Sequence, residues 1–354
     1  MARKTKTKFN VDKLKICFKQ PEGIFETLYN SILLDEINLG GKNYISITHS
    51  EEEIIKNPEI KNNNLLIPRL SKEEEEKGIK NDFTLYVIRE SEVKKTDNKE
   101  DMPTDLQVNI LLPNEGNMLF GKFNFTNSKK YEGLCWFTLS NKALYKQYDY
   151  ECAYSFVYYL NMLAVTLELY YNNITEIEIA CDSTSNLTYK IRKLIKDHEN
   201  FEMIFNGKKI DNPNRKIENY YECFGRSRAK LIPYPTLYFE QVKKDAPLMR
   251  VYNKSLEIAD NNEQKNYIAE WDNFGNSNIH RAEVRLKNES VKQAWQKYTE
   301  HLPHDALMKQ PDGITQMLDE EDFLEWLWVE YTNRMITFND PNGQKVTIHD
   351  LVTA

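Results

Sequence analysis

The sequence has little of what several classes of protein require. Its 354 residues include only 12 Gly, 12 Pro and 5 Cys, and the cysteines are widely spaced with no CxxC pair. An odd number of isolated cysteines indicates reduced core thiols, not a disulfide framework or a cysteine-ligated zinc site. No apolar run approaches the ~18 residues of a membrane helix. The basic N-terminus leads into no apolar stretch, so we also expect no signal peptide.

Common catalytic motifs are missing as well. The chain has no GxxxxGK[ST] phosphate loop, no GxGxxG fingerprint, no HExxH and no GxSxG, which argues against the nucleotide-binding, metallopeptidase and hydrolase classes that depend on them. His301 and His304 form an HLPH segment without an obvious third ligand, so we do not expect a zinc site there. Aromatic residues make up 12% of the chain, which excludes a mainly disordered protein.

Charge is acidic in total but unevenly distributed. The net charge is -7, yet residues 205–254 hold eleven Lys and Arg against five Asp and Glu. A local basic stretch of this kind can bind phosphate groups, although a solvated loop would give the same pattern. The interpretation as a nucleic-acid surface rests on Lys208, Lys209, Arg215, Arg226, Arg228, Lys230, Lys243 and Lys244.

The order of apolar patterns predicts an α+β fold, with an antiparallel sheet and helices packed on one face. Strands are expected near residues 13–18, 83–88, 108–112, 118–125, 134–139, 176–181, 236–239, 248–254 and 279–287, and helices over 150–171 and 187–198. Residues 51–80 are expected to form exposed loop or short helix. Residues 1–288 are predicted to form one domain whose halves, 11–172 and 174–288, resemble a structural repeat. Residues 289–354 are predicted to form a helical C-terminal region.

The second-half strands alternate between apolar and polar residues, so each strand should place its polar side chains on one face. Glu178 and Asp182 share a face of the first strand, with Ala180 between them, and Glu283 lies on the polar face of the last. Hard cations such as Mg²⁺ and Mn²⁺ prefer carboxylate oxygens. We therefore predict a site for Mg²⁺ or Mn²⁺ at Glu178, Asp182 and Glu283. The alternative is an ordinary solvated sheet face.

The same face would carry basic residues and phenols: Tyr238, Arg250, Tyr252, Lys254, Arg281 and Arg285. A tyrosine beside a bound cation can attack phosphorus and form a covalent phosphotyrosine. Its hydroxyl has an unperturbed pKa near ~10, so the cation or a nearby base must favour the phenolate.

Four segments in order resemble the replication initiators of staphylococcal rolling-circle plasmids, a family that includes relaxases of some conjugative elements. TLYFEQVKKDAPLMRVYNKSLE (236–257) resembles the signature of that family, in which T-x-Y-aromatic is followed by R-hydrophobic-Y-[DN]-K. ITEIEIACD (174–182), HRAEVRLK (280–287) and VDKLKICF (11–18) are similar to three of its strands. Two departures are Glu240-Gln241, where the family has Gly-Ser, and Glu178, where it has Asp. The chain also lacks the His-hydrophobic-His pair of other rolling-circle nickases.

The resemblance implies a nicking and closing endonuclease that initiates rolling-circle replication of a plasmid, phage or mobile element in the bacterial cytoplasm. It implies Tyr238 as the nucleophile, with Tyr252 as the alternative, and Arg250, Lys254 and Arg281 as phosphate-contacting residues; we group Arg281 and Arg285 with the DNA-binding residues. The implied partners are origin DNA, single-stranded or extruded as a hairpin, a host helicase and polymerase, and a second copy in a homodimer. Two alternatives remain: an origin-binding protein without nuclease activity, and a structural or host-interaction protein.

Overall fold

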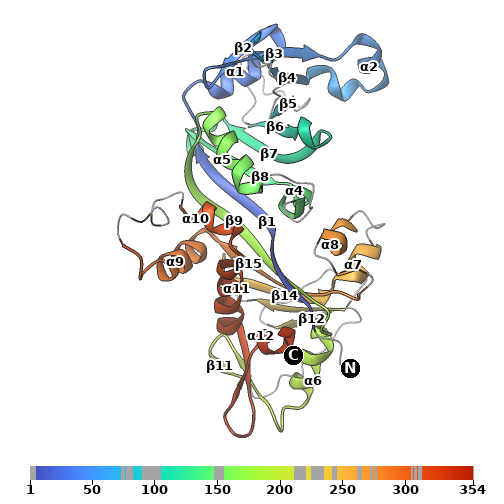
Figure 1. Ribbon diagram of the computed structural model, residues 1–354, viewed down its shortest axis with the longest axis vertical. Helices are drawn as coiled ribbons and strands as arrows, with labels where there is room; N and C mark the ends of the chain where they lie inside the picture. The colour runs from blue at the N-terminus through green and yellow to red at the C-terminus, as the bar shows by residue number, and fades with distance from the viewer. Residues whose placement is uncertain are drawn as a thin grey trace, which may run out of the picture. The chain divides into compact units, whose positions relative to one another are not determined.

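The chain forms two compact units in the computed structural model. The structure describes residues 5–72, 76, 83–89, 105–146, 155–210, 221–224, 235–240, 245–260, 265–271, 274–275, 277–303, 306, 309 and 313–353. Unit 1 comprises Met1–Leu14, Leu144–Ala153 and Glu176–Ala354, and unit 2 comprises Lys15–Ala143 and Tyr154–Thr175. Two long strands, β1 (Thr7–Lys19) and β9 (Tyr170–Ser183), contribute residues to both units (Figure 1).

The sheet of unit 1 has its strands in the order β12-β13-β14-β15-β9-β1. β14 pairs antiparallel with β13 and β15, and β15 pairs antiparallel with β9. The short β12 runs parallel to β13. The remaining strand bounds are β12 (Tyr221–Phe224), β13 (Thr236–Glu240), β14 (Leu248–Asn253) and β15 (His280–Lys287).

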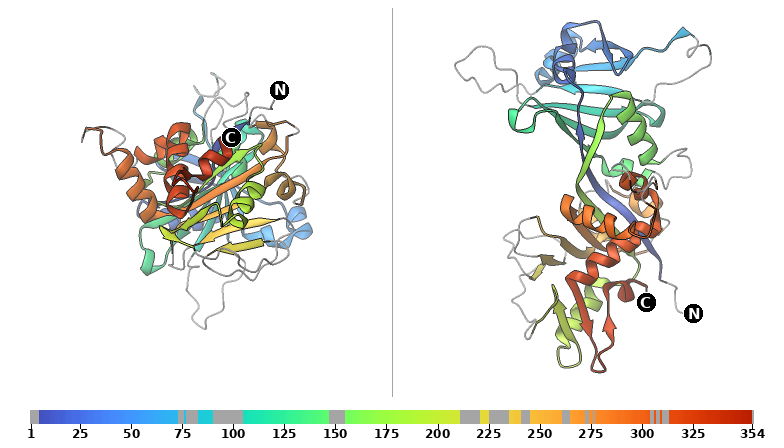
Figure 2. Two further views of the ribbon diagram at one scale, coloured as in Figure 1. Left: turned by 90° about the horizontal axis from the view of Figure 1, so that it is seen from below. Right: turned by 90° about the vertical axis from the view of Figure 1, so that its left-hand side faces the viewer.

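Helices cover the apolar face of this sheet. The indole Nε1 of Trp328 donates a hydrogen bond to the carbonyl oxygen of Ala282 at 2.9 Å, and its ring meets that of Phe9 edge-on. The hydroxyl of Ser183 donates to the carbonyl oxygen of Val352. The helices of this unit are α6 (Leu187–Lys196), α7 (Lys254–Asp260), α8 (Tyr267–Trp271), α9 (Asn288–Tyr298), α10 (Gly313–Gln316), α11 (Glu321–Met335) and α12 (Ile348–Thr353) (Figure 2).

The chain after residue 288 is part of unit 1 and is not entirely helical. Its strand β16 pairs antiparallel with β10 in a small sheet. Met203 of β10 lies opposite Phe338 of β16, and both side chains are buried. The order of that sheet is β11 (Lys208–Lys209), β10 (Glu202–Phe205), β16 (Ile336–Asn339) and β17 (Lys345–Val346).

Unit 2 is an antiparallel sheet whose core is aromatic on one face. The rings of Phe123 and Phe137 lie 4.4 Å apart, and Tyr159 of α5 packs edge-on against Phe120. From β1 outwards the strands are β8 (Leu134–Leu139), β7 (Met118–Thr126), β6 (Asp105–Leu112), β5 (Thr84–Ile88), β4 (Asn64–Pro68), β3 (Lys42–Thr48) and β2 (Glu36–Leu39). The helices are α1 (Ile24–Asn30), α2 (Glu51–Lys56) and α5 (Phe156–Thr166), with α4 (Asn141–Lys146) at the boundary between the units.

The predicted α+β class is confirmed, but the longest predicted helix is wrong at its C-terminal end. Residues 150–171 were expected to be helical, whereas α5 ends at Thr166 and β9 begins at Tyr170. Glu168 between them adopts a positive φ of 52°, which reverses the chain after the helix. Strands β2, β3 and β4 were not predicted from the sequence. Among the described residues, no helix has the length and apolarity needed to cross a membrane.

Candidate metal centre

One face of the unit 1 sheet carries the polar side chains in rows across the strands. Directly opposed residues of an antiparallel pair point to the same face. Tyr238 lies opposite Arg250, which lies opposite Glu283, which in turn lies opposite Ala180. The flanking rows are Thr236, Tyr252, Arg281 and Asp182 on one side, and Glu240, Leu248, Arg285 and Glu178 on the other. The alternation in the sequence thus gives the correct face for each of these residues.

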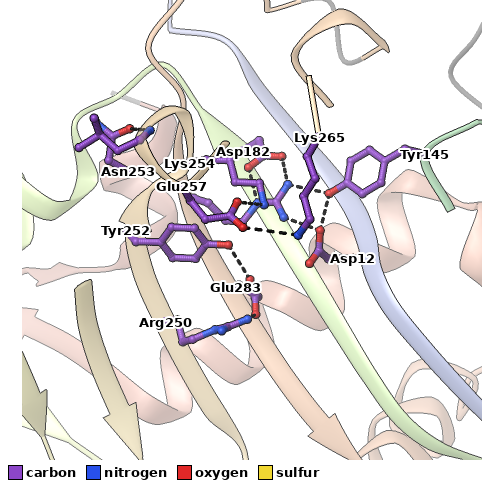
Figure 3. A network of polar contacts seen from close by, with 12 residues as sticks. Asp12, Tyr145, Asp182, Arg250, Tyr252, Asn253, Lys254, Glu257, Lys265 and Glu283 are labelled. Atoms are coloured by element: carbon purple, nitrogen blue, oxygen red, sulfur yellow. Dashed lines mark hydrogen bonds and ion pairs between the residues drawn. The ribbon is translucent and has the colours of Figure 1, made fainter. Parts of the chain in front are cut away.

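Three carboxylates come together on this face. One oxygen from each of Asp12, Glu178 and Glu283 lies within 4.8 Å of the others. Asp12 comes from β1, Glu178 from β9 and Glu283 from β15, so distant parts of the chain build the cluster. Figure 3 labels Asp12 and Glu283. Glu178 and Glu283 are buried, and Asp12 is half-buried. Two of these residues were predicted as metal ligands, and the third was not.

Asp182, the other predicted ligand, lies outside this cluster because it is paired with Arg281. The Nε of Arg281 donates to Oδ1 of Asp182 at 2.7 Å, and its second terminal nitrogen donates to Oδ2. Both side chains are completely buried. The same guanidinium also pairs with Asp12 and donates to the hydroxyl of Tyr145 at 2.6 Å. Arg281 therefore orients the acidic residues, and its burial keeps it from the DNA contact predicted from the sequence.

Asp12 is held in its charged form by this network. The hydroxyl of Tyr145 donates to Oδ1 of Asp12 at 2.9 Å. Burial opposes ionisation of Asp12, but the cations of Arg281, Lys254 and Lys265 outweigh burial and, with that hydrogen bond, hold its pKa well below the usual range. Asp12 is thus anionic at neutral pH, as a metal ligand must be.

The two glutamates differ in protonation. Arg250 pairs with Glu283 and approaches Glu178 at 3.5 Å. Burial opposes the charge on Glu283, but Arg250 outweighs it and lowers the pKa of Glu283. Burial and the negative charge of Glu283 together raise the pKa of Glu178 to about 7. The cluster therefore concentrates negative charge that the two arginines only partly offset, and a cation would relieve the repulsion.

The two tyrosines on this face have different surroundings. The hydroxyl of Tyr252 donates to Oε2 of Glu283 at 3.0 Å. Burial and the Glu283 carboxylate raise the pKa of Tyr252 well above its ordinary value, which disfavours the phenolate. Tyr238 is 7% exposed and lies one strand further from Glu283, opposite Arg250. Tyr252 thus contacts a carboxylate of the acidic cluster directly, as Tyr145 contacts Asp12.

Lys254 begins α7 and is buried beside the cluster. Its Nζ lies 2.6 Å from Glu257, whose other oxygen is 3.4 Å from Lys265. Burial and the Arg281 cation lower the pKa of Lys254. The lysine therefore adds positive charge next to Asp12 (Figure 3).

The predicted DNA-binding residues are only partly described. Lys208 and Lys209 lie on the exposed strand β11, and Lys209 pairs with Glu202. Arg285 is half-buried on the polar face opposite Glu178. The predictions for Arg215, Arg226, Arg228, Lys230, Lys243 and Lys244 fall outside the described residues.

The donor set fits a small hard cation. All three donors of the cluster are carboxylate oxygens, the ligands that Mg²⁺ and Mn²⁺ prefer. Opposite ligands of an octahedral Mg²⁺ ion lie about 4.2 Å apart, given bonds of about 2.1 Å. The three carboxylate oxygens lie within 4.8 Å of one another, so small shifts would bring them to the distances that a bound cation needs. Asp12, Glu178 and Glu283 would hold the ion, with Arg250 and Arg281 moving off the oxygens that they now share.

Sequence reasoning missed Asp12, although a signal was present. Asp12 is the only acid among the first 19 residues, which hold seven bases. It lies in the segment VDKLKICF, which was matched to a strand but not to a ligand. A lone carboxylate in a basic strand indicates a partner supplied by another part of the chain.

Comparisons with known proteins add little to this geometry. No protein-family model matches the sequence, and no curated protein matches it significantly. A solved structure of a rolling circle replication initiator protein from Geobacillus stearothermophilus is similar to 84% of this chain and 80% of its own, with 12% sequence identity and a TM-score of 0.36. A TM-score this low supports no assignment of function.

Proposed function

We propose that the chain is a replication initiator that cuts and rejoins one DNA strand through a covalent phosphotyrosine. The observation that carries the proposal is the cluster of Asp12, Glu178 and Glu283 beside Arg250 on one sheet face. These side chains lie on the strands whose sequences resemble rolling-circle initiators. A structural sheet face gains nothing from three carboxylates gathered within 4.8 Å of one another, whereas a metal-dependent nuclease requires them.

Each residue has a distinct role in the proposed reaction. The hydroxyl of Tyr238 attacks the scissile phosphorus, the bond to the 3′ oxygen breaks, and the 5′ phosphate stays on the tyrosine, while the proton lost by the phenol is balanced by the proton gained by the leaving 3′ oxygen. The strand end that leaves carries a 3′ hydroxyl, and its attack on the phosphotyrosine reverses the step and rejoins the strand. A Mg²⁺ or Mn²⁺ ion at the cluster would supply charge stabilisation on the phosphate oxygens. Arg250 lies opposite Tyr238 and could contact the same phosphate.

Tyr238 is a better proposed nucleophile than Tyr252. Tyr252 donates a hydrogen bond to Glu283, and its pKa is raised well above the ordinary value, so it keeps its proton and serves to orient the Glu283 carboxylate. Tyr238 occupies the T-x-Y-aromatic segment of the resemblance and shares its row with Arg250 and Glu283.

The direct test is a covalent protein–DNA adduct. Supercoiled DNA carrying the gene of this chain and its flanking sequence is incubated with protein and Mn²⁺ or Mg²⁺, and the products are separated under denaturing conditions. We expect a nicked product and an adduct that depend on the metal and disappear in Tyr238→Phe. An adduct that persists in Tyr238→Phe but vanishes in Tyr252→Phe would transfer the role to Tyr252. If no adduct forms with any single-stranded or supercoiled origin substrate, the enzyme assignment fails.

The second candidate is an origin-binding protein with this fold and no nuclease activity. The ion pairs of Arg250 with Glu283 and of Arg281 with Asp12 favour it, because they compensate part of the carboxylate charge without a metal. Such a protein would bind origin DNA equally well with and without divalent cation. A host helicase, a polymerase and a second copy of the chain are further partners implied by the resemblance alone.

A further inference from the structure

The sheet of unit 2 has a second face that its aromatic core does not use. In two adjacent rows across β1, β8, β7, β6 and β5, opposed residues point away from the core. These rows are Lys15, Thr138, Lys122, Asn109 and Tyr86, and Cys17, Trp136, Asn124, Gln107 and Ile88. Lys122 and Asn124 are exposed, Cys17 is buried, and the other seven residues, Trp136 among them, are half-buried. We call these ten residues the amide face.

The opposite side of the same strands is closed by packing. Phe123 and Phe137, which alternate with Lys122 and Trp136, are completely buried. Phe120 packs on Phe137 at 5.6 Å and on Tyr159 of α5 at 5.9 Å. Because successive residues of a strand point to opposite faces, the helix-covered core fixes the amide face on the other side.

The composition of the amide face is unusual for an acidic chain. Its rows contain two lysines and three carboxamides but no carboxylate, although the chain as a whole has a net charge of -7. Asp105, two residues before Gln107 at the start of β6, shares this face but lies one row beyond the amide face. A ligand with negative charge and hydrogen-bonding edges complements this arrangement.

Aromatic rings stand at one end of the face. Tyr131 is 41% exposed, and its ring meets that of Trp136 edge-on with centroids 5.3 Å apart. The Nζ of Lys130 lies 5.0 Å from the centroid of the Tyr131 ring. Rings that carry a lysine on one side provide both a stacking surface and a phosphate contact.

We propose that the amide face binds single-stranded DNA. Lysines 15, 122 and 130 would contact phosphates, Trp136 and Tyr131 would stack on unpaired bases, and Asn109, Asn124 and Gln107 would bond base edges. A duplex hides the faces of its bases, so the rings favour a single strand. The proposal rests on the proposed function for its setting, because strand cutting at an origin produces single-stranded DNA, but its evidence lies in unit 2 alone.

Binding of an oligothymidylate of about 20 nucleotides to the full chain tests the proposal. Fluorescence anisotropy is measured at low salt in EDTA, so that the acidic cluster of unit 1 holds no metal. We expect Lys122→Glu with Lys130→Glu to weaken binding about tenfold or more, and Trp136→Ala to weaken it about fivefold or more. Trp136→Phe keeps an aromatic face and should retain most of the affinity. Lys56→Glu with Lys61→Glu, the same change of charge at exposed positions of α2 and of η2 (Pro58–Asn62), is the matched control and should stay within about twofold.

The outcomes separate this proposal from the proposed function. If all the variants bind the oligonucleotide as the unchanged chain does, or if the unchanged chain prefers duplex of the same length, the amide face is not a single-strand site. Loss of binding in the amide-face variants together with a failed adduct assay would leave this proposal intact and end the nuclease assignment. Normal adduct formation by the unchanged chain, with unaltered oligonucleotide binding in the variants, would support the nuclease assignment and end the proposal for the amide face. Circular dichroism of each variant excludes unfolding as the cause of weaker binding.

Discussion

The hydroxyl of Tyr252 donates a hydrogen bond to Oε2 of Glu283 at 3.0 Å, inside a sheet face where both side chains are buried. The other oxygen of the same carboxylate pairs with Arg250. Glu283 is thus fixed by a phenol on one side and a guanidinium on the other. This arrangement gives Tyr252 a positioning role and leaves the nucleophilic role to another tyrosine.

Tyr252→Phe should therefore weaken the protein without abolishing chemistry. Removal of the hydroxyl leaves one oxygen of a buried carboxylate without its donor, which costs about 1–3 kcal/mol in the free energy of unfolding. We expect slower adduct formation in Tyr252→Phe and none in Tyr238→Phe. Urea unfolding and the adduct assay measure the two effects. Equal activity losses in the two variants would contradict the division of roles.

Arg281 is predicted to be the most sensitive basic residue of unit 1. It pairs with both Asp12 and Asp182, so Arg281→Met removes the cation from a half-buried and a fully buried carboxylate and should cost about 3–5 kcal/mol. Arg281→Met combined with Asp182→Asn should recover part of that loss, because one of the uncompensated charges is removed. The comparison is made by chemical unfolding of both variants. A double variant no more stable than the single one would show that the pair with Asp182 contributes little.

Glu178 predicts a pH dependence of stability. Its pKa is raised from 4.5 to about 7, so between these values the folded chain keeps a proton that the unfolded chain has lost. The stability contributed by Glu178 is full below about pH 4.5 and is lost as the pH rises through about 7. Glu178→Gln should remove this decline. Urea unfolding of both proteins in EDTA, at about pH 5 and about pH 8, measures it.

His280 contributes the opposite slope, because burial lowers its pKa to about 4 from 6.5. Its stabilising effect grows as the pH rises through that interval. The quantity to compare is therefore the difference in the free energy of unfolding between the unchanged chain and Glu178→Gln. His280 contributes equally to both proteins, so its effect cancels in this difference. A difference that does not vary with pH would mean that Glu178 is not shifted.

Loss of a metal ligand should separate cutting from binding. Glu283→Ala should abolish Mn²⁺-dependent nicking and leave duplex binding largely intact, because the acidic cluster serves chemistry and basic residues elsewhere serve affinity. Calorimetric titration should show that Glu283→Gln has lost Mn²⁺ binding. Glu321→Gln should keep it, because Glu321 is an exposed acid that pairs with Lys8 outside the cluster. Equal loss of nicking and DNA binding would contradict this separation.

Unit 2 contains a buried arginine, Arg89, whose hydrogen-bond partners among the described residues are neutral oxygens and not carboxylates. The five N–H groups of the Arg89 side chain donate to the carbonyl oxygens of Tyr29, Asn62 and Leu28 and to the side chains of Asn64 and Ser31. Arg89→Lys cannot satisfy these acceptors and should cost about 3 kcal/mol. Arg69→Lys, at an exposed pair with Glu36, should cost less than about 1 kcal/mol in the same unfolding experiment.

The sequence by itself determined which side chains share the polar face of the unit 1 sheet. Alternation along β14, β15 and β9 places Arg250, Glu283 and Glu178 together because successive residues of a strand point to opposite faces. That rule is local, so it could be read from the chain without knowing which strands pair. The α+β class followed from the same patterns.

Only the tertiary structure decided which carboxylates meet. β1 lies next to β9, so Asp12 joins Glu178 and Glu283, while Asp182 turns its two oxygens to Arg281. These choices depend on strand order and on contacts between residues far apart in sequence. The end of α5 was decided in the same way, because the apolar run 150–171 continues into β9 and pattern alone cannot distinguish a buried helix from a buried strand.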